Sequence, residues 1–102
     1  MAARTGIVAA METEQNEALK ALGREIRKAR QSRGLSQEGF AMEARLGRSY
    51  YGGVERGERN ISALNLMRIA ICLHVEVGEL FPSALELRTL LDGESKDTVP
   101  LD

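Results

Sequence analysis

The sequence predicts a small all-α protein with one folded domain. It has 102 residues, which is enough for one domain of ordinary size and too few for two. Aromatic residues make up only 4% of the chain and Trp is absent, so the core must be built from Leu, Ile, Val, Met and Ala. From about residue 14 onward these residues recur every three or four positions, which is the spacing of one helix face. A β-sandwich and an enzyme with a deep cleft are therefore disfavoured.

The scarcity of reactive side chains excludes several kinds of site. Cys72 is the only cysteine and His74 the only histidine, so we expect neither an internal disulfide nor a zinc site. No run approaches the roughly 18 apolar residues of a membrane span, and the apolar stretch 6–11 is too short for a signal peptide. Nothing indicates an enzyme, because a His–carboxylate pair and a Gly-rich phosphate loop are lacking. We therefore expect a cytoplasmic protein without a cofactor, a metal or a membrane contact.

The charge is distributed unevenly along the chain. The formal net charge is only −1, yet residues 20–60 hold ten Lys or Arg side chains against five Glu. Acidic residues outnumber basic ones in the segments on both sides. A basic centre between acidic ends suggests one positive face, as nucleic-acid binding requires. Charge alone fits an ordinary solvated helix surface equally well.

The first helix is expected over about residues 14–32, where the apolar residues share one face. Gly34 follows as a stop signal, because glycine readily adopts the left-handed conformation that ends many helices. Residues 1–13 show no such period and are interpreted as a flexible tail, in which Met1 and Met11 are both candidate starts.

Two short helices are expected next. Ser36 occupies an N-cap position before a helix over about residues 37–44, and Gly57 closes a further helix over about residues 47–56. Two such helices joined by three or four residues have the geometry of a helix-turn-helix. The apolar wedge between them would consist of Phe40, Ala41, Ala44, Leu46, Tyr51 and Val54.

The rest of the chain is expected to form three further helices. Ser62 caps the first of them, which ends near His74, and residues 76–81 form a short one that Pro82 stops. The last lies within residues 84–91, ahead of an acidic tail.

Four stretches follow a known pattern: 22–30 (LGREIRKAR), 34–38 (GLSQE), 48–50 (RSY) and 54–60 (VERGERN). With the apolar positions that continue to Phe81, they resemble the phage-repressor and Cro-like helix-turn-helix regulators, often called the XRE family. The resemblance covers about residues 20–81 of the chain.

The resemblance implies a five-helix repressor-like DNA-binding domain, followed here by a short C-terminal helix. Its third helix would enter the major groove of double-stranded DNA, and the protein would act as a homodimer on a symmetric operator. The expected boundaries are 1–13 for the flexible tail, 14–82 for the DNA-binding domain, and 83–102 for the short helix and acidic tail. Because no sensor domain is attached, the chain looks particularly like the controller proteins of restriction–modification systems, which are small autoregulators of this family.

The residues expected at the DNA belong mainly to the outward arc of the third helix. Arg48 can donate two hydrogen bonds to a guanine, although a phosphate contact or plain exposure is the alternative. Gln37 resembles the phosphate-binding glutamine of the family, and Tyr50 would either reach a phosphate or pack against the preceding helix. The full predicted set is Gln37, Arg48, Ser49, Tyr50, Gly52, Gly53, Arg56, Arg59 and Asn60.

The sequence departs from the family pattern at several positions near the turn. Arg45 stands where the family usually has Gly, and Gly47 stands where it usually has Ser or Thr. The third helix also contains Gly52 and Gly53, each of which costs about 0.5 to 1 kcal/mol relative to Ala. A looser recognition helix is expected, whose missing side chains would let it sit closer to the groove.

Two further groups have structural roles in the prediction. Arg30 borders the apolar stripe, where a cation is costly unless paired, and Glu55 resembles its partner in the family. The dimer interface is expected to contain apolar residues away from the third helix, with stray surface exposure or folding back onto the core as alternatives. These residues are Ile71, Val75, Val77 and Leu85.

The leading hypothesis is a sequence-specific transcriptional regulator, which would contact RNA polymerase or a partner protein in addition to DNA. An antitoxin-type module is the alternative, in which the acidic C-terminal tail neutralises a basic partner and the helix-turn-helix autoregulates. A neighbouring toxin-like or endonuclease gene would distinguish the two.

Overall fold

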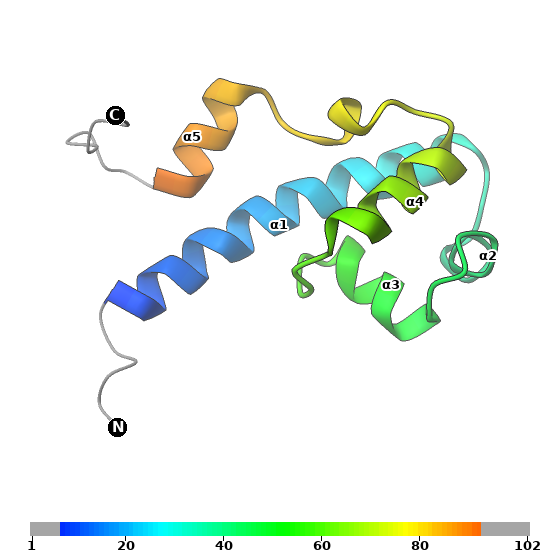
Figure 1. The fold of residues 1–102 in the computed structure, drawn as a ribbon, viewed down its shortest axis with the longest axis horizontal. Coiled ribbons are helices and arrows are strands. Elements are labelled where there is room, and N and C mark those ends of the chain that lie inside the picture. The colour runs from blue at the N-terminus through cyan, green and yellow to red at the C-terminus, as the bar shows by residue number, and fades with distance from the viewer. Residues whose placement is uncertain (1–6, 93–102) are drawn as a thin grey trace.

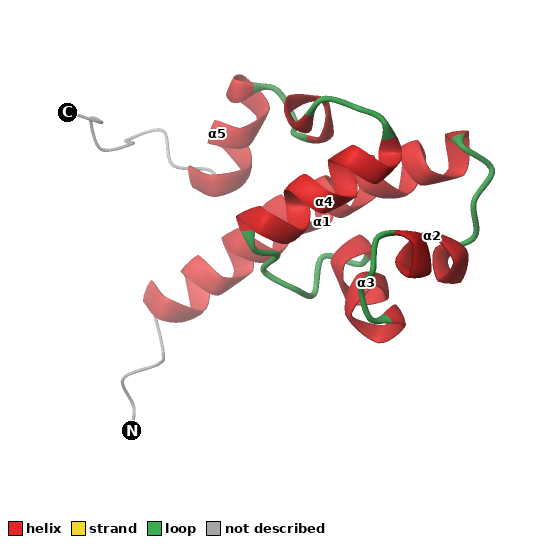
Figure 2. Ribbon diagram, turned by 45° about the vertical axis from the view of Figure 1, so that its right-hand side comes forward, coloured by secondary structure: helices red, strands yellow, loops and turns green. Residues whose placement is uncertain are grey.

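The computed structural model describes the backbone of residues 7–92 and the side chains of residues 17–92. The all-α class is confirmed over this range, which contains helices and no strand (Figure 2). The elements are α1 (Ile7–Ser32), α2 (Gln37–Glu43), α3 (Arg48–Glu55), α4 (Ala63–Leu73), the 3-10 helix η2 (Val77–Leu80) and α5 (Ala84–Asp92).

The long helix α1 is the axis around which the other elements are arranged (Figure 1). α2, α3 and α4 gather around the C-terminal part of α1, and α3 contacts both α1 and α2. α5 packs along α1 on the other side, away from α2 and α3. The helix-turn-helix therefore lies at one end of the molecule.

A single apolar core joins these elements. The largest fully buried side chains are Ile26 of α1, Phe40 of α2, Tyr51 of α3, Ile69 of α4 and Leu80 of η2. The rings of Phe40 and Tyr51 lie 5.2 Å apart between their centroids, which is normal for an interacting aromatic pair. Because α1, α2, α3, α4 and η2 each contribute one of these side chains, α2 and α3 are held against the rest of the domain as a unit.

Two glycines allow α3 to approach α1 closely. A Cβ atom on Gly23 would lie 2.4 Å from the backbone oxygen of Glu55, and one on Gly57 would lie 2.6 Å from Cα of Lys20. Any larger residue would therefore push the two helices apart. The sequence contains both glycines within the family-like stretches, but their spatial role could not be read from it.

The same backbone motif ends α2 and α3. After α3, Glu58 N–H donates to the Gly53 carbonyl (2.8 Å) and Gly57 N–H to the Val54 carbonyl (3.1 Å), with Gly57 at φ 76°. After α2 the left-handed residue is Arg45, at φ 60°. The departure from glycine at this position thus leaves the turn intact, at the modest cost of a side chain in left-handed backbone.

The expected element boundaries need two corrections. α1 begins at Ile7 and not near residue 14, because extending a formed helix through a segment that contains Ala9, Ala10 and Met11 costs little compared with nucleating one. The short helices α2 and α3 end within one residue of expectation, and the segment before Pro82 is a one-turn 3-10 helix. Residues 1–6 of the expected tail and the acidic residues 93–102 lie outside the described residues.

Candidate nucleic-acid interface

A hollow of about 420 Å³ opens between the start of α2 and the outer face of α3. It is lined by five of the residues predicted to meet DNA, and we call it the recognition hollow. These residues are Gln37, Arg48, Ser49, Gly52 and Arg56. The fold therefore brings together polar side chains from two helices on one concave surface.

Arg48 and Ser49 stand at the start of α3 and are exposed. Gly47, the residue before them, gives α3 no side-chain cap. The first N–H groups of α3 therefore have no partner from the N-cap side chain, and such groups attract anions. This end of α3 combines a guanidinium, a hydroxyl and backbone donors, the groups that contact bases and phosphates.

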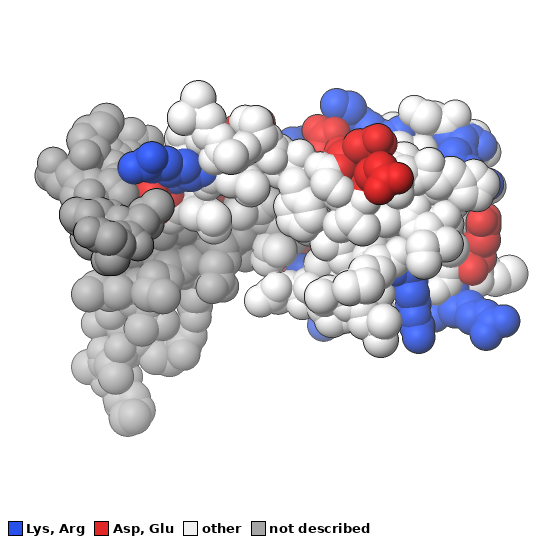
Figure 3. All heavy atoms as spheres, turned by 45° about the horizontal axis from the view of Figure 1, so that its top comes forward, with Lys and Arg blue, Asp and Glu red and all other residues white. Residues whose placement is uncertain are grey.

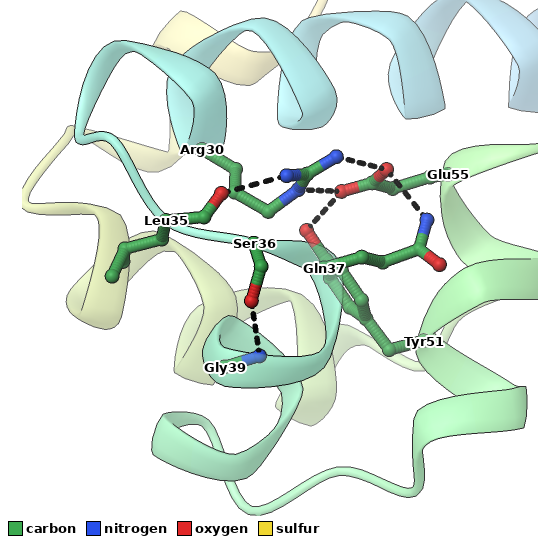
Figure 4. Close-up of polar contacts among 7 residues, drawn as sticks. All are labelled: Arg30, Leu35, Ser36, Gln37, Gly39, Tyr51 and Glu55. Carbon is green, nitrogen blue, oxygen red and sulfur yellow. Dashed lines mark hydrogen bonds and ion pairs between the residues drawn. The ribbon is translucent and has the colours of Figure 1, made fainter.

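A buried polar network lies behind the recognition hollow (Figure 4). Arg30 of α1 donates from Nε to Oε2 of Glu55 (2.7 Å) and from Nη2 to Oε1 (3.0 Å). Tyr51 Oη donates to Glu55 Oε2 (2.5 Å), and Gln37 Nε2 donates to Glu55 Oε1 (3.0 Å). Arg30 Nη1 also donates to the carbonyl of Leu35 (2.7 Å). One carboxylate thus links α1, α2 and α3.

The network keeps its charges despite burial. Burial of Glu55 opposes ionisation, but the hydrogen bonds from Arg30, Tyr51 and Gln37 together lower the pKa of its carboxyl below the ordinary value. The hydrogen bond to Glu55 raises the pKa of Arg30. Burial, together with the Glu55 carboxylate, raises the pKa of Tyr51, so its hydroxyl stays a donor.

Gln37 is part of this network because its side chain donates to Glu55. Its side chain is half-buried, with one N–H given to Glu55 and with Oε1 lying over Gly52. The Gln37 amide is therefore held in one orientation at the wall of the recognition hollow. Its expected phosphate contact would use the remaining N–H.

The prediction placed Gly52 and Gly53 on the outward arc of α3, but in the structure neither glycine is open to solvent. Both are buried by neighbouring side chains. A Cβ on Gly52 would lie 3.1 Å from Nη1 of Arg56, and one on Gly53 would lie 2.9 Å from Cγ of Arg59. The glycines make room for arginine side chains that cross the helix, which the sequence spacing could not reveal.

Tyr50, Arg59 and Asn60 have separate surroundings. Tyr50 Oη accepts a hydrogen bond from Asn65 Nδ2 of α4 (3.2 Å), and the Arg59 guanidinium lies over the Tyr50 ring, 5.9 Å from its centroid. Asn60 instead borders a smaller hollow of about 210 Å³, which Ala18, Leu19 and Leu91 also line. Asn60 is therefore not part of the recognition hollow.

Two acidic residues that sequence reasoning missed lie beside the predicted DNA-binding arginines. Glu58 Oε2 is 3.1 Å from Nε of Arg56, and Glu38 Oε2 is 3.9 Å from Nη1 of Arg48. Figure 3 shows that basic and acidic side chains lie among one another on the face that it presents. The signal in the sequence was Glu58 itself, two residues after Arg56 and directly after the helix-ending Gly57.

The residues expected at a dimer interface differ in exposure. Ile71 and Leu85 are 72% and 76% exposed, Val77 is 37% exposed, and Val75 is half-buried against the core. Ile71 borders a hollow of about 360 Å³ between the α2–α3 turn and α4. Across the described part of the chain, no group of three His, Cys, Asp or Glu is suited to a metal ion, and no helix could span a membrane.

The sequence profile of the helix-turn-helix family matches residues 26–80, which include α2, α3 and α4. The chain belongs to the helix-turn-helix family. As a helix-turn-helix protein it is a DNA-binding transcriptional regulator, which confirms the leading hypothesis at the level of the family.

Several relatives of this helix-turn-helix protein are controllers. Control protein C.MunI of a Mycoplasma species is 42% identical over 60 residues, 58% of this chain and 81% of the relative. Control protein C.BamHI of Bacillus amyloliquefaciens is 36% identical over 75 residues, 72% of this chain and 88% of the relative. A solved relative is the restriction-modification controller protein C.AhdI from Aeromonas hydrophila, whose sequence is 48% identical. Its crystal structure matches with a TM-score of 0.60, over 62% of this chain and 96% of that one. The resemblance to controller proteins is therefore confirmed.

Proposed function

We propose that the protein acts in the cytoplasm as a homodimer that binds a two-fold symmetric operator and controls a restriction–modification system, including its own expression. The observation that carries this proposal is the recognition hollow, in which Arg48, Ser49 and Arg56 stand on the exposed side of α3. The controllers among its relatives support the choice of regulated system.

Within this proposal the residues have different tasks. Arg48, at the N-terminal end of α3, would read a guanine through O6 and N7, and Ser49 beside it would bond a base edge or a phosphate. Arg56, Arg59 and the free N–H of Gln37 would bind phosphates, which supply affinity for DNA of any sequence. Two-fold symmetry would place two such surfaces about 34–36 Å apart, one turn of the double helix.

Selection of bound duplexes from a random pool tests the proposal. The purified protein should enrich a sequence with two inverted half-sites about one helical turn apart. The enriched sequence should also occur upstream of the gene for this protein and, in a restriction–modification locus, near the endonuclease gene. Enrichment of no common sequence would contradict specific binding, and enrichment of a single half-site would contradict the homodimer.

A further inference from the structure

We propose that Glu38 and Glu58 compete with DNA for the arginines of the recognition hollow, and that this competition keeps binding to random DNA weak. The inference rests on the proposed function, because it concerns how the same surface distinguishes its operator from other DNA. It assigns a role in DNA affinity to both acidic residues, and a role in specificity to Glu38 alone, although neither is expected to touch bases or phosphates.

Glu58 is held beside Arg56 by the backbone. The Glu58 N–H closes the end of α3 by donating to the Gly53 carbonyl (2.8 Å), and its carboxylate lies 3.1 Å from Nε of Arg56. Both side chains are more than half exposed, at 56% for Arg56 and 60% for Glu58. The Arg56 guanidinium beside it lowers the pKa of the Glu58 carboxyl, so the pair is charged at neutral pH.

Glu38 has the corresponding position beside Arg48. It lies in the first turn of α2, and its Oε2 is 3.9 Å from Nη1 of Arg48, within range of a Coulombic attraction without a hydrogen bond. Both arginines that line the recognition hollow therefore face a carboxylate. A phosphate or base that binds either arginine therefore competes with that carboxylate for the charge and the donors of the guanidinium.

The two acids should affect DNA binding differently. Exposed ion pairs are weak, so displacing one carboxylate costs about a two- to fivefold loss of affinity. Arg56 would meet a phosphate on any DNA, so Glu58 should weaken the operator and random complexes equally. On the operator, Arg48 would exchange its attraction to Glu38 for two hydrogen bonds to a guanine. On random DNA it would gain only a contact with a single phosphate, which compensates less for the lost attraction. Glu38 should therefore weaken random binding more than operator binding.

The test compares Glu58→Gln, Glu38→Gln and Glu86→Gln in the full chain, on the duplex that the wild-type protein selects and on a random duplex of equal length. Glu86 is an exposed residue of α5, so its variant makes the same charge change away from the recognition hollow. We expect Glu58→Gln to tighten both complexes about two- to fivefold beyond the control. Glu38→Gln should tighten the random complex more than the selected one. Gains no larger than those of Glu86→Gln would overturn the proposal.

A second comparison separates competition from simple repulsion between carboxylate and phosphate. In an Arg56→Ala background, Glu58→Gln should give no gain beyond the control, because the cation for which the acid competes is gone. A gain that persists in this background would show that Glu58 acts on phosphates directly, and the competition would be wrong. Failure of the wild-type protein to bind any DNA would instead contradict the proposed function itself.

Discussion

Arg30 of α1 and Glu55, the last residue of α3, form a two-bond ion pair with side chains that are only 9% and 2% exposed. Because Glu55 also accepts from Gln37 at the start of α2, this pair fixes both helices of the helix-turn-helix against the long helix. The position of Arg48 and Ser49 over the recognition hollow thus depends on a contact made behind it.

Removing either partner of this pair should destabilise the protein by about 3 to 5 kcal/mol, because the remaining charge stays buried without its partner. Arg30→Met, Glu55→Gln and the double variant would be compared by urea unfolding. We expect the double variant to lose less stability than the sum of the single losses. Breaking the exposed Lys28–Glu25 pair, with nitrogen and oxygen 3.4 Å apart, is the control and should cost under about 1 kcal/mol. Additive losses at Arg30 and Glu55 would mean that the two side chains do not interact.

The stability of the fold should fall in acid partly because of Glu55. Its pKa in the folded protein lies below the ordinary value of 4.5, so the native state favours the carboxylate more than the unfolded chain does. This contribution is present in full above about pH 4.5 and is lost as the pH falls through the lowered pKa. The stability difference between the wild type and Glu55→Gln should therefore shrink as the pH is lowered below 4.5. A difference that is constant from pH 7 to pH 3 would refute the assignment.

Alanine at Gly23 and at Gly53 should have contrasting effects. The Cβ of Gly23→Ala would meet backbone oxygen at 2.4 Å, so α3 must shift and about 1 to 3 kcal/mol of stability should be lost. The Cβ of Gly53→Ala would meet Cγ of Arg59 at 2.9 Å, so the arginine side chain must move, while the helix gains about 0.5 to 1 kcal/mol.

Thermal unfolding would give the stability of both glycine variants, and titration with random DNA would give their affinity. We expect Gly53→Ala to keep its stability and to bind DNA more weakly, because Arg59 leaves its place over Tyr50. Full affinity in Gly53→Ala would mean that the position of Arg59 does not matter for binding. A Gly23→Ala protein as stable as the wild type would contradict the close contact between α1 and α3.

Ile71→Glu should disrupt the proposed homodimer. Ile71 is 72% exposed on α4, so a charge there should leave the monomer fold intact but would meet its own symmetry mate in a two-fold contact. Sedimentation velocity would report the loss of the dimer. Gln31→Glu, which adds the same single charge at an exposed position of α1, is the control and should stay dimeric. If Ile71→Glu remained dimeric, the interface would not include Ile71, and the exposed Leu85 would be the next candidate.

Local signals in the sequence predicted the short helices well. Ser36 and Ser62 cap α2 and α4 as expected, because a serine hydroxyl satisfies an N–H two or three residues ahead whatever the tertiary structure. The start of α1 had no such marker, and the apolar period faded before residue 14 although the helix continues to Ile7. Capping chemistry is local, whereas helix extension is decided by small differences in propensity.

The site was harder to predict because its geometry depends on long side chains. A helical wheel placed Gly52 and Gly53 on the outer arc of α3, but Arg56, Arg59 and Gln37 fold back over them. Spacing along a helix gives the direction of Cβ and cannot give the path of an arginine. The same limit hid the approach of Glu58 to Arg56, which depends on the left-handed turn at Gly57.

The proposed function requires α3 to read DNA sequence through Arg48, and this role is tested by measuring the binding of Arg48→Ala to selected and random duplexes over a range of salt concentrations. Arg48→Ala should cost about 1 to 3 kcal/mol on the selected duplex and little on the random one. Arg56→Ala, the comparison, should weaken both complexes alike and reduce the salt dependence by about one phosphate contact. Equal weakening of both duplexes by Arg48→Ala would contradict base reading by this residue and reduce it to a phosphate contact.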